Sequence, residues 1–166
     1  MESRKLALID IDGVLADDSI RIHYALDKNW IQYFSEQNMM ADKVLPQGWD
    51  LITQKLAEGY DVELLTGRRE DLRGTTRAWL WYHEFPTLRI HMKPMGTKLP
   101  LATFKANYML ELKAKRALQG VTYSEMILWD DDPEVVREVQ KQLGSESAVH
   151  CTWYIKKSAM VTAAKT

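Results

Sequence analysis

The stretch that decides the fold lies near the start of the chain and reads Lys5-Leu6-Ala7-Leu8-Ile9-Asp10-Ile11-Asp12-Gly13. The apolar run at 5–9 has the length of a buried strand, and two acids follow it at positions i and i+2. Their carboxylates can project the same way with the Ile11 carbonyl between them, which makes a hard-oxygen site suited to Mg²⁺. Taken alone, the motif is equally typical of an ordinary capping turn.

Working outward from this strand, apolar runs of strand length alternate with segments of helical period. The runs lie at 60–65, 88–92, 126–129 and 149–155, and the helical patterns at 48–58, 71–83, 101–118 and 133–143. Strands that alternate with helices imply right-handed crossovers and a parallel sheet. The sequence therefore predicts one α/β domain over residues 1–166, with a Rossmann-like, doubly wound, mainly parallel sheet.

Residues 16–45 interrupt this alternation. The stretch is rich in aromatic residues and largely polar from Asp17 to Asp27, and it predicts a turn and flap followed by a helix around 29–37. Ligands of an open α/β sheet bind beyond the carboxyl ends of the strands. An insertion directly after the first strand would overhang such a site, so we expect a lid or minimal cap. A long surface excursion is the alternative.

Composition narrows the class of protein. The chain has 22 basic and 23 acidic residues and a net charge of −1, which argues against sequence-independent binding of nucleic acid. A single cysteine, Cys151, cannot form an internal disulfide. The sequence contains no signal-peptide apolar region and no run of 18 apolar residues, so we expect a cytoplasmic protein without membrane attachment.

Two more strand ends carry polar and charged residues that suit a reaction site. Thr66-Gly67-Arg68 offers a hydroxyl, free backbone N–H groups and a guanidinium, which suit a phosphate, although the same residues also make a plain loop exit. Asp130-Asp131-Asp132-Pro133 follows the apolar run at 126–129. Capping the next helix requires one of these acids, and we expect it to be Asp132. The other two acids are left for another role.

Lys105 lies near the start of the helix expected at 101–118, where a lysine opposes the helix dipole. A position facing the carboxylates would explain it, because the ammonium would offset their charge and that of a phosphoryl group. Lys93 and Lys98, on the preceding loop, are rival candidates, and most lysines in such a stretch are simply solvated.

The order acid pair, hydroxyl, lysine, acid pair resembles the haloacid dehalogenase superfamily of phosphotransferases over residues 10 to about 155. More narrowly, it is similar to the phosphatase domain of bacteriophage-type polynucleotide kinases. The residues that carry the resemblance are Asp10-Ile11-Asp12-Gly13, Thr66-Gly67-Arg68, Arg73-Gly74-Thr75-Thr76-Arg77-Ala78-Trp79-Leu80, Met92-Lys93-Pro94, Phe104-Lys105, Asp130-Asp131 and Glu134-Val135-Val136. The resemblance implies a single phosphatase domain in which residues 16–45 form the cap.

The resemblance also implies catalytic roles. Asp10 would attack phosphorus to give an aspartyl-phosphate, and Asp12 would protonate the leaving oxygen and later deprotonate water. Thr66 and Lys105 would hold the phosphoryl oxygens. The ligands of Mg²⁺ are expected among Asp10, the Ile11 carbonyl, Asp12, Asp130 and Asp131. Related proteins usually carry an acid four residues before the lysine, whereas this chain has Leu101, which puts the orientation of Lys105 in doubt.

The resemblance implies that the chain is a Mg²⁺-dependent phosphomonoesterase for nucleotides or nucleic-acid 3′-phosphate ends and that it works without an obligate protein partner. If the gene belongs to a phage, the expected location is the host cytoplasm. A collar of basic residues at the predicted mouth would suit further phosphates: Arg68, Arg69, Arg73, Arg77 and Lys98. Of the mouth residues, Gly67, Arg68, Arg77 and Lys98 are the expected substrate contacts. A solvated helix face paired with Glu70 and Asp71 explains the collar equally well. Trp30, Tyr33 and Trp49 could stack on a base, although packing is the commoner role.

Three other functions remain open. A 5′(3′)-deoxynucleotidase or other small-molecule phosphatase would use the same acids. A phosphoacceptor receiver domain also combines acids, a threonine and a lysine, but its acceptor aspartate ends a later strand, where this chain has Thr66. A non-catalytic binding domain would not need the full set of acids.

Overall fold

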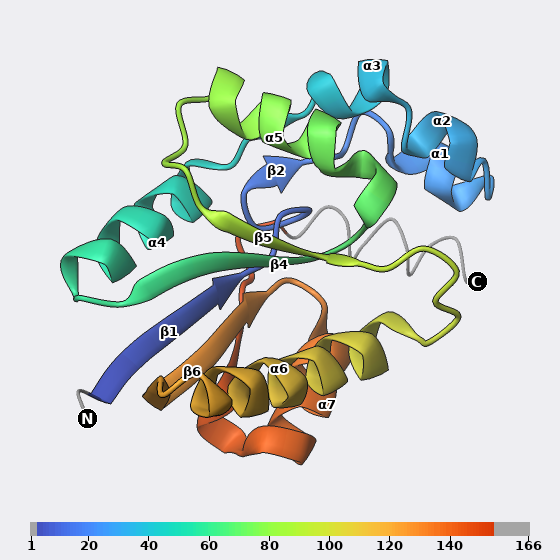
Figure 1. Ribbon diagram of the computed structural model, residues 1–166. Coiled ribbons are helices and arrows are strands. Elements are labelled where there is room, and N and C mark those ends of the chain that lie inside the picture. The colour runs from blue at the N-terminus through green and yellow to red at the C-terminus, as the bar shows by residue number, and fades with distance from the viewer. Residues whose placement is uncertain (1–2, 155–166) are drawn as a thin grey trace.

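Figure 1 shows the computed structural model, which describes residues 3–154. A five-stranded, wholly parallel sheet with the order β5-β4-β1-β6-β7 forms its centre. The strands are β1 (Ser3–Ile9), β4 (Asp61–Arg69), β5 (Arg89–Lys93), β6 (Thr122–Asp130) and β7 (Ala148–His150). Because β1 pairs with β4 on one side and β6 on the other, the strand order reverses there. In such sheets the ligand crevice lies at the carboxyl ends beside that reversal.

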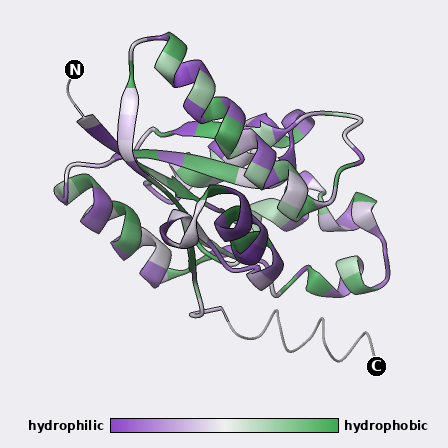
Figure 2. Ribbon diagram, turned by 90° about the horizontal axis from the view of Figure 1, so that it is seen from below, coloured by the Kyte–Doolittle hydropathy of each residue, from purple (hydrophilic) through white to green (hydrophobic). Residues whose placement is uncertain are grey.

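Helices cover both faces of the sheet, so the predicted doubly wound α/β fold is confirmed (Figure 1). Helices α4 (Pro46–Ala57) and α5 (Arg73–Tyr82) pack on one face, and α6 (Leu101–Leu118) and α7 (Pro133–Leu143) on the other. Successive side chains of a strand point to opposite faces. Ala7 and Ile9 accordingly pack with α4 and α5, whereas Leu6 and Leu8 pack with α6 and α7. Figure 2 shows hydrophilic and hydrophobic residues alternating along the helices.

Several element ends differ from the predicted ones. Helix α4 begins at Pro46, two residues before the predicted start, because proline suits the first turn of a helix, where its missing N–H is not needed. Strand β4 continues through Thr66-Gly67-Arg68 to Arg69, four residues beyond the predicted end at residue 65. Strand β7 ends at His150; of the strand predicted at 149–155, residues 151–154 are not strand and Ile155 lies outside the described residues.

The insertion is a short antiparallel ribbon that carries three helices. Ala16 pairs with Val44 and Asp17 with Lys43, so the two ends of the insertion meet. The ribbon strands are β2 (Ala16–Asp17) and β3 (Lys43–Val44), and the helices are α1 (Ile22–Leu26), α2 (Trp30–Tyr33) and α3 (Glu36–Met40). The prediction of one helix around 29–37 was wrong. Two short helices replace it: Asn29 caps the start of α2, and the side chain of Ser35 caps the start of α3.

Buried hydrogen bonds hold the insertion to the rest of the domain. The Asp18 carboxylate is fully buried and accepts from the hydroxyls of Tyr33 and Tyr154, at 2.5 and 2.8 Å. The indole Nε1 of Trp79 in α5 donates to the Asp42 carbonyl at 3.0 Å. The insertion therefore rests on α5 and on the segment after β7. Within residues 3–154, no helix is long and apolar enough to cross a membrane.

Candidate active site

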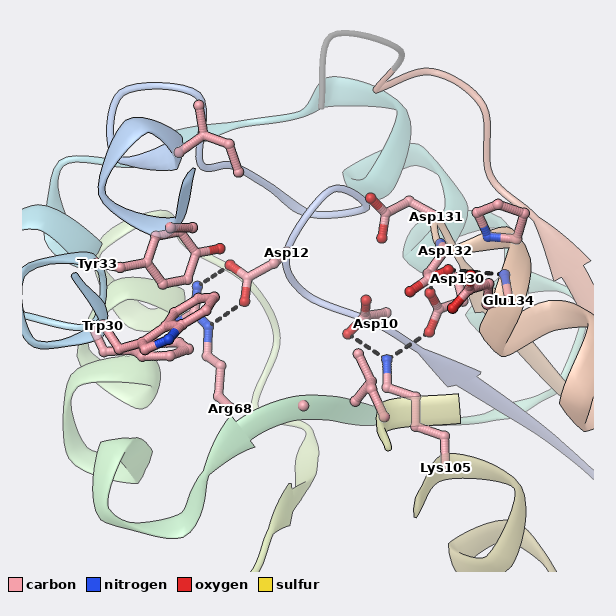
Figure 3. Close-up of a pocket in the computed structure, with 16 residues that line it drawn as sticks. Asp10, Asp12, Trp30, Tyr33, Arg68, Lys105, Asp130, Asp131, Asp132 and Glu134 are labelled. Carbon is pink, nitrogen blue, oxygen red and sulfur yellow. Dashed lines mark hydrogen bonds and ion pairs between the residues drawn. The ribbon is translucent and has the colours of Figure 1, made fainter. Parts of the chain in front are cut away.

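A pocket of about 500 Å³ opens at the carboxyl ends of β1, β4 and β6, and the insertion forms one side of it (Figure 3). Its volume is within the ~300–1,000 Å³ typical of small-molecule sites. The pocket is lined by Asp10, Asp12, Ile22, Ala25, Trp30, Tyr33, Phe34, Gly67, Arg68, Leu101, Lys105, Asp130, Asp131, Asp132, Pro133 and Glu134. The structure thus brings together six residues that were predicted from the ends of three strands, namely Asp10, Asp12, Gly67, Arg68, Asp130 and Asp131.

Three buried acids meet on one side of this pocket. Asp10 follows β1, Asp130 ends β6 and Asp131 comes next, and one carboxylate oxygen from each lies within 4.8 Å of the others. The Lys105 ammonium reaches in from α6, with Nζ 3.0 Å from Asp10 Oδ1 and 2.6 Å from Asp130 Oδ2. Lys105 is fully buried. Leu101 therefore does not prevent the lysine from reaching the acids, because Asp10 and Asp130 themselves orient it.

Burial and neighbouring charges shift the pKa values of Asp10 and Lys105. Burial raises the pKa of Asp10 well above its usual range, and the carboxylates of Asp130, Asp131 and Asp12 add to the effect, while Lys105 opposes it. Burial acts to lower the pKa of Lys105, but Asp10 and Asp130 outweigh it and raise that pKa. The lysine therefore stays charged. Three converging carboxylates around a single ammonium are a donor set that fits a divalent, oxygen-seeking cation such as Mg²⁺.

Gly13 makes room for this cluster. Its φ of +82° lies in the left-handed region, and a Cβ at this position would lie 2.0 Å from Oδ2 of Asp131. Glycine is therefore required both by the backbone and by the approach of the third acid. Gly13 thus lets the chain leave β1 through a turn that other residues rarely adopt.

We expect Gly13→Ala to destabilise the fold by more than the ~1–2 kcal/mol that a left-handed alanine costs, because Asp131 must also move. Gly120→Ala is the matched control, since Gly120 has a φ of +80° and nothing within 4 Å of its would-be Cβ. Urea unfolding of both variants measures the difference. Equal losses would show that the closeness of Asp131 does not constrain position 13.

The carbonyl of Ile11, predicted as a metal ligand, has backbone partners. It accepts the N–H groups of Val14, Leu15 and Ala16 at 3.2, 2.8 and 2.9 Å. These bonds form the turn that carries the chain from β1 into the insertion. A carbonyl oxygen has two lone pairs, so three donors already satisfy it. We therefore leave Ile11 out of the proposed metal site.

Asp12 faces away from the acid cluster and towards Arg68 (Figure 3), and Arg21 contacts it as well. Its Oδ1 accepts from Nη2 of Arg21 and Nη2 of Arg68, both at 2.7 Å, and its Oδ2 accepts from Nε of Arg68 at 3.0 Å. Asp12 had been predicted both as a proton carrier and as a metal ligand. This geometry separates it from the three metal-compatible acids and leaves it at the pocket wall.

The two arginines share a second buried acid, Asp42. Arg21 grips it through Nε and Nη2 at 2.8 and 2.7 Å, and Nη2 of Arg68 lies 3.6 Å from it. Burial raises the pKa of Asp42 to about 6, although Arg21 acts to lower it, so the acid is ionised at neutral pH. Arg21 and Asp42 come from the insertion, and the sequence analysis missed both because neither belongs to a strand-end motif.

Thr66 and Gly67 are adjacent residues of β4, and Gly67 lines the pocket whereas Thr66 does not. Thr66 is fully buried, and its Oγ1 accepts the backbone N–H of Arg68 at 3.1 Å. Gly67 lines the pocket, and a Cβ there would lie 2.6 Å from a methyl group of Leu101. Leu101 thus packs against the strand at the position where the resemblance leads one to expect an acid.

Most of the predicted basic collar lies elsewhere. Arg69 pairs with Asp71 and Arg73 with Glu70, as expected of a solvated helix face. Arg77 and Lys98 are exposed and do not line the pocket. Of the predicted collar, Arg68 alone belongs to the lining.

The remaining predicted residues have simple outcomes. The side chain of Asp132 accepts the N–H of Glu134 at 2.9 Å and caps α7, which confirms its predicted role. Trp30 and Tyr33 line the pocket, whereas the ring of Trp49 packs 5.5 Å from that of Phe85.

Comparison with known proteins shows the fold. No protein-family profile and no curated protein matches the sequence. A chain in the structure of the Pnkp1/Rnl/Hen1 complex is similar, with a TM-score of 0.68 and 20% identity over 91% of this chain. This chain spans about half of that one (47%).

Two full-length neighbours are a haloacid dehalogenase-like family hydrolase from Streptococcus pneumoniae and a phosphoserine phosphatase in its apo form. The first has a TM-score of 0.65 and 16% identity, and covers 99% of this chain and 92% of its own. The second has a TM-score of 0.55 and 14% identity, and the match covers 93% of this chain and 91% of the phosphatase chain. The haloacid dehalogenase-like fold that the sequence resemblance implied is therefore confirmed.

Proposed function

We propose that this chain is a Mg²⁺-dependent phosphomonoesterase that works through an aspartyl-phosphate on Asp10. The observation that carries the proposal is the buried cluster of Asp10, Asp130 and Asp131, bridged by the Lys105 ammonium at the reversal point of the sheet. The hydrolases and phosphatases among the similar structures support the same reaction class.

In the first step, a carboxylate oxygen of Asp10 attacks phosphorus. A new O–P bond forms, the bond from phosphorus to the leaving alcohol breaks, and Asp12 gives its proton to the departing oxygen. The charge of a dianionic phosphate beside Asp12 favours the protonated form that this step needs. Lys105 offsets the charge of Asp10 and of the phosphoryl oxygens.

In the second step, water attacks the phosphorus of the acyl phosphate while Asp12, now a carboxylate, takes a proton from it. The bond between phosphorus and Asp10 breaks, inorganic phosphate leaves and the Asp10 carboxylate is regenerated. Arg21 and Arg68 hold Asp12 through three hydrogen bonds of 2.7–3.0 Å, which favour its ionised form. They therefore prepare Asp12 for this step.

Asp10, Asp130 and Asp131 would hold the Mg²⁺ ion. When bound, the metal neutralises charge on the phosphoryl group and on the three acids. Because Mg²⁺ would bind the folded state and not the unfolded one, it should also stabilise the fold. At 100 times the Kd, the gain is about 2.7 kcal/mol, or roughly 5–10 °C in Tm for a chain of this size.

We expect Asp131→Asn to abolish most of this Mg²⁺-dependent rise in Tm, since it removes one of the three carboxylates. The measurement is thermal unfolding with and without Mg²⁺, and Asp50→Asn, at an exposed position of α4, is the control. A rise of equal size in the Asp131 variant would contradict the metal site.

Turnover separates the enzyme from the non-catalytic alternatives. With Mg²⁺ present, the protein should release many equivalents of phosphate from an aryl phosphate. A receiver-like domain would stop after one equivalent, and a binding domain would release none. Three classes of phosphomonoester are candidate substrates: nucleotides, nucleic-acid 3′-phosphate ends and other small-molecule phosphates. A cytoplasmic location and the lack of an obligate protein partner stay predictions.

A further inference from the structure

The charged groups of the pocket wall are distributed unequally. Within the part of the chain that the structure describes, the only lysine or arginine side chains in the lining are Arg68 and Lys105. Both are buried, and their donors are engaged: Arg68 bonds Asp12 and Thr76, and Lys105 contacts Asp10 and Asp130. Among residues 3–154, no exposed cation therefore lines the part of the pocket that a ligand would occupy beyond the reacting phosphate.

The outer wall on the α7 side is acidic. Asp132 is half-buried and Glu134 is exposed, and both line the pocket where α7 begins. A second phosphate group on a ligand would approach these carboxylates rather than a basic collar. Nearby like charges raise the free energy of such a complex.

The opposite wall, formed by the insertion, is aromatic and apolar. Trp30 leaves 53% of its surface exposed although it lines the pocket. Its ring stacks on Phe34 with centroids 6.3 Å apart and planes inclined by 26°, and it meets Tyr33 edge-on at 5.8 Å. Ile22 and Ala25 extend the same wall. Two neighbouring rings thus support an indole at the edge of the cavity, as in a platform for a flat ligand.

From this wall we infer that the substrate is a small phosphomonoester whose leaving group carries one aromatic ring system and no further phosphate, and that Trp30 determines this specificity. The inference rests on the proposed phosphomonoesterase function. The reacting phosphate lies at Asp10 and Lys105, and the ring of the leaving group stacks against Trp30. A nucleoside monophosphate has this chemistry.

A nucleic-acid strand fits the same pocket poorly. Strands carry a phosphate at each nucleotide, and proteins that hold them line the path with lysine and arginine. Here the corresponding surface offers Asp132 and Glu134, while Arg77 and Lys98 lie outside the pocket. A cavity of about 500 Å³ is also of a size for one small ligand.

The test compares matched substrates in the presence of Mg²⁺. Thymidine 3′- and 5′-monophosphate are each paired with the 1,2-dideoxyribose phosphate that lacks the base, and thymidine 3′,5′-bisphosphate supplies the second phosphate. We expect the base to raise kcat/KM by about 10-fold or more for at least one isomer, since stacking on an aromatic side chain is that favourable. The second phosphate should lower kcat/KM.

Trp30→Ala should bring the ratio of kcat/KM with and without the base down towards one, mainly through KM. Trp30→Phe should retain most of the ratio, because a flat ring remains. Trp81→Ala is the control, since Trp81 is 81% exposed on α5 and does not line the pocket. Its ratio should equal that of the wild type.

Two results would overturn the inference. The first is a ratio of kcat/KM with and without the base near one for both isomers, and the second is a bisphosphate or 3′-phosphorylated oligonucleotide hydrolysed faster than either monophosphate.

Calorimetry with the Asp10→Asn protein and Mg²⁺ distinguishes failure of the inferred ligand class from failure of the phosphatase proposal. Base-dependent binding of a monophosphate that the wild type never hydrolyses would support the ligand class and contradict the phosphatase. Turnover without a base preference would support the phosphatase and contradict the inferred ligand class.

Discussion

Replacing Asp10 by asparagine is expected to lower kcat by at least about 1,000-fold, because a carboxamide cannot attack phosphorus and form the acyl phosphate. The substitution keeps the size of the side chain and removes one negative charge from a buried cluster, so the fold should survive. Hydrolysis of an aryl phosphate with Mg²⁺ measures the loss.

Asp50→Asn makes the same chemical change at an exposed position of α4 and should leave kcat within about twofold. If the Asp10 variant turned over as fast as this control, the nucleophile would have to be a different group. Far-ultraviolet circular dichroism of both proteins shows whether the fold is intact.

Replacing Arg21 by methionine is expected to lower the free energy of unfolding by about 3–5 kcal/mol, which is a large part of the stability of a typical domain. Arg21 is fully buried and donates to Asp12, to both oxygens of Asp42 and to the Tyr33 carbonyl. Methionine fills similar space but leaves Asp42 buried with much less compensation. Urea unfolding at neutral pH measures the change.

Arg69→Met is the matched control, because Arg69 and Asp71 form a solvent-exposed ion pair at 2.9 Å whose loss costs about 0–1 kcal/mol. The double variant Arg21→Met, Asp42→Asn should recover part of the lost stability, since no ionised acid is then stranded at position 42. A double variant less stable than the Arg21 single variant would contradict this explanation of the loss.

The sequence predicted the parts of the site that lie at the ends of regular elements. In a parallel sheet, the carboxyl ends of neighbouring strands meet at one edge, so acids after β1 and β6 had to lie close together. Lys105 was predictable because a lysine near a helix start needs a compensating negative charge. The structure places it against Asp10 and Asp130.

The parts that the sequence could not predict depend on tertiary packing of the insertion. Arg21 and Asp42 lie 21 residues apart and form a bidentate pair only because β2 and β3 bring the ends of the insertion together. The prediction of a basic collar failed because it relied on closeness in the sequence rather than on tertiary packing. Arg77 and Lys98 are close to the motifs in sequence, but the helix face and loop that carry them lie outside the pocket.

Some of the missed local structure did have a signal in the sequence. Pro46 marks the first turn of α4, and Asn29 and Ser35 each cap a short helix. These caps divide the aromatic-rich stretch into α2 and α3. Trp30, Tyr33 and Phe34 belong to α2 and its C-terminal cap, and their spacing of three and four residues places the three rings together in one wall of the pocket.

The most direct test of the central proposal is to look for the phosphoryl group on Asp10. The Asp12→Asn variant is mixed with an aryl phosphate, whose leaving group needs no proton, so the first step proceeds while hydrolysis of the acyl phosphate is slowed. After acid quenching, mass spectrometry of the peptides should find one phosphoryl group on Asp10. Wild-type turnover with no phosphoryl group on Asp10 in the quenched variant would contradict the account.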